Sequence, residues 1–191
     1  MTLAVKEFFT TRSIHKNLNS NFLSLIPKVK NVVSIDKLRP IILGNFIFKV
    51  CTKILADRLG LIAPRILSGN QFGFVKDKKI QECIALASKG FNSLKSKSKE
   101  GNIAIKADIR KAFDTLDWDF VLEVMRCFGL LDIFRDLVCN IFNSAKISIL
   151  HNGSPRGFFC CSHGVRQSDP LSPFLFDSAE DFLSCFLSKN I

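Results

Sequence analysis

The sequence Ile-Ala-Ile-Lys-Ala-Asp-Ile-Arg-Lys-Ala-Phe-Asp-Thr-Leu-Asp-Trp occupies residues 103–118 and decides how the fold is interpreted. Its first half alternates, and one side carries the apolar residues Ile103, Ile105, Ala107 and Ile109. Alternation of this kind predicts a strand with one face on a core. That strand would present Asp108 at its far end, where a carboxylate held by a ladder can bind a divalent cation. An Asp at a strand end is also a common turn or cap residue, so this stretch alone does not decide between the two.

Before this stretch, apolar periodicity predicts helices and two strands. The helices are expected at residues 3–17, at 44–59 with a second short helix to 67, and at 80–94. The strands are expected at residues 22–26 and 38–42. Pro64 is expected to start or break the short helix, because proline cannot donate a backbone hydrogen bond.

After this stretch, Asp117 is expected to cap a helix over residues 118–128 that Gly129 closes. Further helices are expected at residues 131–142 and 171–187, with a loop at 163–173 between the last strand and the last helix. Asn152-Gly153 predicts a tight hairpin between strands at residues 146–151 and 157–161. The predicted fold class is α+β, a small antiparallel sheet backed by helices.

The composition fits one soluble globular domain, or one domain with two lobes. The chain has 191 residues, of which 47% are hydrophobic and 23% are charged. Its net charge of +10 indicates an anionic partner, with nucleic acid the first candidate and an anionic membrane surface the second. It contains no apolar run long enough to span a membrane and no secretory signal pattern, so we expect an intracellular protein, nuclear or cytoplasmic and not secreted.

The seven cysteines are scattered, and most of them lie in apolar periodic segments. An odd number without a metal-binding spacing is typical of reduced thiols in an intracellular protein. We therefore expect buried free thiols.

Several segments, taken in order, resemble the reverse transcriptase of non-LTR (LINE-type) retrotransposons. The matching segments are residues 22–28, 38–45, 53–59, 106–114 and 165–173, together with Gln71, Phe74 and Asn152-Gly153. The resemblance implies a right-hand polymerase, with a fingers-like helical lobe and short hairpin at 1–101 and a partial palm at 102–191. It also implies RNA-directed DNA synthesis, in which an RNA template, a DNA primer and deoxynucleoside triphosphates are the partners and no membrane is involved.

The resemblance assigns roles to residues of the palm. Asp108 occupies the position of the first metal ligand and catalytic carboxylate, for Mg²⁺ or Mn²⁺. Phe113 matches the aromatic residue that distinguishes deoxyribose from ribose by its bulk, although a core aromatic is an equal alternative from the residues alone. Asp114 and Asp117 are interpreted as caps or hydrogen-bond acceptors.

Nucleotide-binding residues are implied on the fingers and on the loop. Arg39 is the expected triphosphate contact, because a guanidinium can bind phosphate oxygens in a bidentate manner. Lys28 is a second fingers cation, and a solvated surface residue is the alternative for Arg39. Gln167 matches the residue that packs on the incoming nucleotide, and Arg166 is expected to hold either the template or the loop itself.

The sequence departs from the family in two places. Ser168 replaces a glycine, and a serine would be strained if that position needed a positive φ or a close backbone approach. The chain also ends at Ile191 without the next palm motif, Tyr-x-Asp-Asp, and it contains no tyrosine. We therefore expect a truncated reverse transcriptase domain that is inactive by itself. The alternative is a non-catalytic basic nucleic-acid-binding or scaffold fragment of a decayed retroelement.

Overall fold

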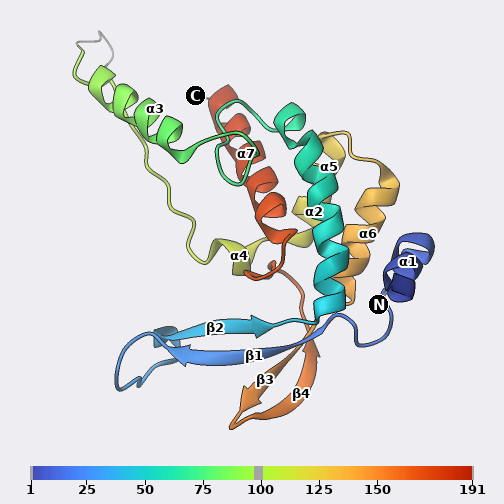
Figure 1. The fold of residues 1–191 in the computed structure, drawn as a ribbon. Coiled ribbons are helices and arrows are strands. Elements are labelled where there is room, and N and C mark those ends of the chain that lie inside the picture. Colours follow the sequence, from blue (N-terminus) through green and yellow to red (C-terminus); the bar gives the residue numbers. More distant parts are fainter. Residues whose placement is uncertain (1, 97–100, 191) are drawn as a thin grey trace.

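The computed structural model describes residues 2–96 and 101–190 (Figure 1). The α-helices are α1 Thr2–Thr11, α2 Phe46–Ile66, α3 Ile80–Ser93, α4 Ala112–Thr115, α5 Trp118–Cys127, α6 Asp132–Asn143 and α7 Ser172–Asn190. The strands are β1 Ser20–Pro27, β2 Leu38–Leu43, β3 Lys146–His151 and β4 Ser154–Cys160, with a 3₁₀ turn at Ile35–Lys37. Helices α1, α2, α5, α6 and α7 gather in one body, the sheet projects from one end of it, and α3 extends away (Figure 1). The α+β class predicted from the sequence is confirmed.

The sheet is mixed, which corrects the prediction of an antiparallel one. Its strand order is β2-β1-β3-β4. The pairs β1–β2 and β3–β4 are antiparallel hairpins, whereas β1 and β3 run parallel, with Asn21 opposite Ile147. Each hairpin is visible in the local sequence pattern, but the pairing between hairpins depends on residues distant in the sequence. The sheet therefore spans the domain boundary expected between residues 101 and 102, because β1 and β2 come before it and β3 and β4 come after it.

The second hairpin turns where the sequence predicts. Asn152 and Gly153 have φ angles of 50° and 76°. Positive φ at both central residues matches the right-handed twist of the flanking strands, and Asn-Gly adopts it with little strain.

Helices α1 and α2 differ most from their predicted bounds, while α7 runs to Asn190 and not to residue 187. Helix α1 ends at Thr11 and not near residue 17, because Arg12 takes a left-handed φ of 58°. Helix α2 continues through Pro64 as one helix to Ile66. Pro64 removes one donor in the last turn of α2, but the helix still closes, because the amide of Leu67 bonds to the carbonyl of Ala63.

The core lies between the helices and not on the sheet faces. Its fully buried side chains come mainly from α1, α2, α5, α6 and α7 and include Phe8, Phe48, Leu55, Leu59, Met125, Val138, Leu171 and Leu175. Asp117 caps α5 as predicted, since its side chain accepts from the amide of Phe120 at 2.8 Å. Gly129 follows α5 with a φ of 73°, as expected of a residue that closes a helix.

The strand predicted at residues 103–109 is not formed. This part of the chain is irregular and exposed (Figure 1). The four strands of the described part of the chain pair with one another, and residues 103–109 pair with none of them. An alternating pattern makes one face suitable for burial, but a strand also needs a neighbour for its backbone groups.

The cysteines are all free, but most are not buried. Only Cys51 is buried, while Cys127 and Cys160 are exposed. Burial raises the pKa of the Cys51 thiol. Among the described residues, no helix is both long and apolar enough to cross a membrane.

Candidate functional site

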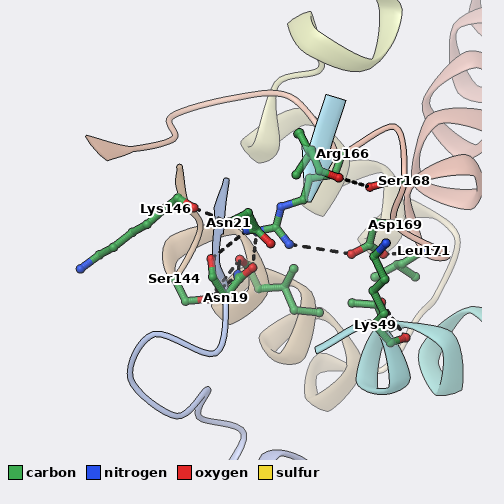
Figure 2. Close-up of polar contacts among 12 residues, drawn as sticks. Asn19, Asn21, Lys49, Ser144, Lys146, Arg166, Ser168, Asp169 and Leu171 are labelled. Atoms are coloured by element: carbon green, nitrogen blue, oxygen red, sulfur yellow. Dashed lines mark hydrogen bonds and ion pairs between the residues drawn. The ribbon is translucent and has the colours of Figure 1, made fainter. Parts of the chain in front are cut away.

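Arg166 lies at the centre of a buried polar cluster that joins the loop of residues 163–171 to the rest of the fold (Figure 2). Its guanidinium donates to Oδ1 of Asn19, and its Nη1 atom lies 3.9 Å from Oδ2 of Asp169. The guanidinium carbon also lies 4.8 Å from the centre of the Phe48 ring, a cation–π contact. Burial lowers the pKa of Arg166, and the negative charge of Asp169 opposes that effect. Of the two roles expected for Arg166, these contacts match holding the loop.

Asp169 belongs to the same cluster and lies three residues before the start of α7. Its carboxylate accepts from the amide of Leu171 at 2.9 Å. Burial raises the pKa of Asp169, while the Leu171 amide and the charge of Arg166 act in the opposite direction. A buried carboxylate and a buried guanidinium stabilise each other's charge, so this ion pair fixes the position of the loop.

Phe113 is fixed beside this loop through backbone contacts. The amide of Val165 donates to the carbonyl of Phe113 at 2.7 Å, and the amide of Gly164 donates to that of Leu116 at 2.7 Å. The indole of Trp118 donates to the carbonyl of Gly164 at 2.8 Å. The structure therefore brings the end of the stretch quoted first against the Arg-Gln loop.

The side chain of Phe113 packs inward. It is half-buried and stacks on Phe176 of α7, with the ring centres 5.1 Å apart and the planes inclined by 21°. This packing fits the core alternative given for Phe113, and its role beside a ribose stays a prediction.

Gln167 and Ser168 lie on the exposed outer side of the loop. The hydroxyl of Ser168 donates to the carbonyl of Ile42 in β2 at 3.3 Å. The backbone of Ser168 is not among the residues with positive φ, so the serine is not strained there. The glycine that the loop does require is Gly164, whose φ is 81°.

Arg39 and Lys28 lie on the β1–β2 hairpin and are exposed. Arg39 pairs with Ile26 in the ladder, and Lys28 donates from Nζ to the carbonyl of Asp36 at 3.3 Å. Neither takes part in an ion pair among the described residues. Both cations are therefore available to an anionic ligand, and the contact of Ser168 with β2 places the Gln167 loop against the same hairpin.

Asp108 lies in the irregular segment and is exposed. It is not carried on a strand end, which corrects the geometry predicted for it. Across residues 2–96 and 101–190, no three His, Cys, Asp or Glu side chains come close enough to hold a metal ion. The part of the chain that the structure describes thus brings no two further ligands to Asp108, and a site for two divalent cations needs more than it offers.

A cavity of about 160 Å³ lies behind the loop. Most of its lining is apolar, including Trp118, Phe142 and Leu175. Its polar lining includes Arg166, whose guanidinium is already in contact with Asn19 and Asp169.

A second polar cluster, which the sequence did not predict, attaches the segment after α2 to α7. Ser68 donates through its amide, at 2.9 Å, and through its hydroxyl to Asp181. Lys78 donates from Nζ to the carbonyls of Ser68, Gly69 and Gln71, at 3.0, 3.0 and 2.6 Å. Gln71, which the family resemblance includes, donates to the carbonyl of Asp177 at 3.3 Å.

Asp177 is the unusual acid of this second cluster. Burial, and then the charges of Glu180 and Asp181, raise its pKa to about 7. One feature of the sequence could have indicated this cluster. Asp177 and Asp181 lie four residues apart, within the apolar periodicity of the last helix. The buried residues Asn19 and Asn21 gave no such signal.

Comparison with known proteins identifies the family of this chain. Residues 26–191 match the family described as reverse transcriptase (RNA-dependent DNA polymerase), and the chain belongs to that family. The resemblance to relatives identifies it further, as a reverse transcriptase domain of a non-LTR retrotransposon.

The relatives are polyproteins of R2 elements. The chain is 28% identical over 168 residues to the retrovirus-related Pol polyprotein of a type-1 R2 element of Popillia japonica, covering 87% of this chain and 23% of that protein. It is 26% identical over 190 residues to the R2 polyprotein of Nasonia vitripennis, covering 97% of this chain and 18% of the relative. It is 34% identical over 84 residues to the Pol polyprotein of the type-2 element R2DM of Drosophila melanogaster. This match covers 44% of this chain and 8% of that protein. The chain therefore spans less than a quarter of the length of these relatives.

Proposed function

We propose that this chain is the fingers and part of the palm of an RNA-directed DNA polymerase that extends a DNA primer on an RNA template. The observation that carries the proposal is the contact of Phe113 and Leu116 with the Val165 and Gly164 amides, which joins two family segments far apart in sequence. Membership of the reverse transcriptase family supports a nucleic-acid template and primer and nucleotide substrates. The division into fingers at 1–101 and partial palm at 102–191 belongs to the same proposal.

Within this proposal, the exposed face binds the nucleotide. Arg39 holds the triphosphate, with Lys28 as a second cation, and Gln167 packs on the incoming nucleotide. Phe113 limits the space beside the ribose 2′ position. Arg166 acts indirectly, since it holds the loop that carries Gln167.

Asp108 is proposed as one ligand of a divalent cation. Reverse transcriptases use divalent metal ions, whose chemistry is to stabilise charge at phosphorus. Since the described residues bring no cluster of three ligands together, they do not complete the site. We infer that this chain, by itself, binds substrates but does not carry out synthesis.

Primer extension tests this inference. The purified chain is incubated with an RNA template, an annealed DNA primer, deoxynucleoside triphosphates and Mg²⁺ or Mn²⁺, beside the Asp108→Ala variant. We expect no extension from either protein. Robust synthesis that Asp108→Ala abolishes would contradict the inactivity and would at the same time support the metal role of Asp108.

A non-catalytic nucleic-acid-binding protein is the second candidate. The net charge of +10 and the unpaired hairpin cations favour it. Binding to an RNA–DNA duplex that weakens steeply with salt and does not change in Asp108→Ala would support this candidate. Absence of binding at low salt would exclude it.

A further inference from the structure

Asn19 lies directly before β1 and links the N-terminal part of the chain to the loop that carries Gln167 (Figure 2). It is 2% exposed. Its Nδ2 atom donates to the carbonyl of Ile141 and to Oγ of Ser144, both at 2.7 Å. Both hydrogens of Nδ2 are therefore used at the end of α6, and Oδ1 is left to accept from the guanidinium of Arg166.

The groups around this amide allow it one orientation. If the amide were turned over, Nδ2 would face the guanidinium of Arg166, donor against donor, and Oδ1 would face the carbonyl of Ile141. The backbone of Asn19 is held as well, because its carbonyl accepts from the amide of Lys146 at 3.2 Å. Asn19 thus offers the loop an acceptor that is fixed in place.

Gln167 takes its position from its two neighbours. Among the described residues, neither its backbone nor its side chain forms a hydrogen bond. The residue before it, Arg166, is bound to Asn19, and the residue after it, Ser168, donates to β2 at 3.3 Å. Since Asp169 belongs to the same loop as Arg166, the attachment of Arg166 to the segment before β1 comes from Asn19.

We propose that Asn19 is a positioning residue for nucleotide binding, which holds Gln167, through Arg166, where the incoming deoxynucleoside triphosphate binds. This role rests on the proposed function, which assigns the nucleotide to Gln167. Because Asn19 is buried, it acts through Arg166 and not by touching the substrate. Asn19 also lies outside residues 26–191, so the match to the family does not include it.

Two substitutions separate the contacts of Asn19. Asn19→Ala removes the acceptor for Arg166 and both donors to the end of α6, whereas Asn19→Asp keeps the acceptor and loses only the donors. Asn140→Ala is the matched control. Its amide donates to the carbonyl of Arg12 at 2.8 Å, and so attaches the same segment to α6 through a contact that does not involve Arg166.

Trp118 reports the place of the loop without any nucleotide. It is the single tryptophan of the chain, and its indole donates to the carbonyl of Gly164 at 2.8 Å. We expect acrylamide to quench its fluorescence more strongly in Asn19→Ala than in the wild type, and equally in Asn140→Ala and the wild type. Unchanged quenching in Asn19→Ala would overturn the proposal, because the loop would then keep its place without Asn19.

Nucleotide affinity tests the role itself. The purified protein is bound to an RNA template with a DNA primer that ends in a dideoxynucleotide, and the matching fluorescent deoxynucleoside triphosphate is titrated in with Mg²⁺. We expect its dissociation constant to rise about tenfold in Asn19→Ala and to stay within about twofold of the wild type in Asn19→Asp and Asn140→Ala. The affinity for the RNA–DNA duplex should be the same in all four proteins, since Asn19 positions the loop alone.

The outcomes separate this role from the proposed function. A wild type that binds the duplex but no nucleotide would overturn both. Nucleotide binding that Asn19→Ala leaves unchanged, or that Asn19→Ala and Asn140→Ala weaken equally, would overturn the positioning role alone. Asn19→Leu keeps most of the side-chain volume and replaces Asn19→Ala if that variant does not fold. If neither variant folds, Asn19 serves the fold as a whole, and the positioning role is overturned.

Discussion

A methyl group added to Gly164 would lie 2.7 Å from the carbonyl oxygen of Asp114. The loop that carries Gln167 and the short helix that carries Phe113 are therefore in contact through their backbones. No side chain fits between them at this point, and the φ of 81° at Gly164 would strain any other residue there.

Gly164→Ala should lower the free energy of unfolding by about 2 kcal/mol or more, since a positive φ and a backbone overlap both oppose the new methyl group. Gly153→Ala is the control, because Gly153 has a φ of 76° but open space around it. Denaturant unfolding of both variants separates the two effects. If both variants lose the same stability, the close approach to Asp114 is not important.

Arg166→Met should destabilise the protein by about 3–5 kcal/mol, because the carboxylate of Asp169 would remain buried without its partner. Methionine keeps an unbranched chain over the Phe48 ring, so the loss reports mainly on the charge. Arg39→Met is the control, since Arg39 is exposed and in no ion pair, and its unfolding free energy should change by less than about 0.5 kcal/mol. Equal stability of Arg166→Met and the wild type would show that the buried pair does not hold the loop.

Asp177→Asn should remove part of the pH dependence of stability. The pKa of Asp177 is raised to about 7 from an ordinary value of 3.8, so the folded protein keeps a proton that the unfolded chain releases. Stability from this group is therefore complete below about pH 4 and is lost as the pH rises through about 7. Asp177 forms no ion pair among the described residues that would offset this loss.

Thermal unfolding across pH checks this expectation. At about pH 8 we expect Asp177→Asn to melt a few degrees above the wild type, and near pH 4 the two should coincide. Asp119→Asn, at an exposed position of α5, controls for the loss of one charge. A wild type whose melting temperature stays constant between these pH values would contradict the raised pKa.

Ser168→Gly restores the residue of the family and should nevertheless reduce stability by about 1 kcal/mol. The glycine loses the hydrogen bond to Ile42 and gains backbone freedom in the unfolded state. Chemical unfolding measures the difference, and Ser162→Gly in the exposed loop before it controls for backbone freedom. An increase in stability would mean that this position favours a conformation that only glycine adopts easily.

The local features of the fold could be predicted from the sequence. Asn152-Gly153 located the second hairpin, and Asp117 located the start of α5, because each acts on its immediate neighbours. The parallel pairing of β1 with β3 could not be predicted, since it depends on how the helices position two distant hairpins. The interpretation of residues 103–109 as a strand was wrong for the same reason, because alternation reports one suitable face and not the presence of a neighbour.

The candidate site could be predicted less fully than the fold. The order of the family segments indicated Gln167, Arg39 and Phe113, but not that Arg166 would be buried with Asn19 and Asp169. Such a cluster forms where the residue before β1, the loop before α7 and helix α2 meet, and no single stretch of sequence contains it.

The parallel contact between β1 and β3 has a consequence for how the protein is made. During synthesis the hairpin of β1 and β2 leaves the ribosome long before residue 146. The edge of β1 that later pairs with β3 is therefore unpaired during that time. The sheet can close only after residues 146–160 have been synthesised, and until then that edge is free to pair with other chains. Chaperones that cover extended strands would therefore be expected to act on this protein early in its production.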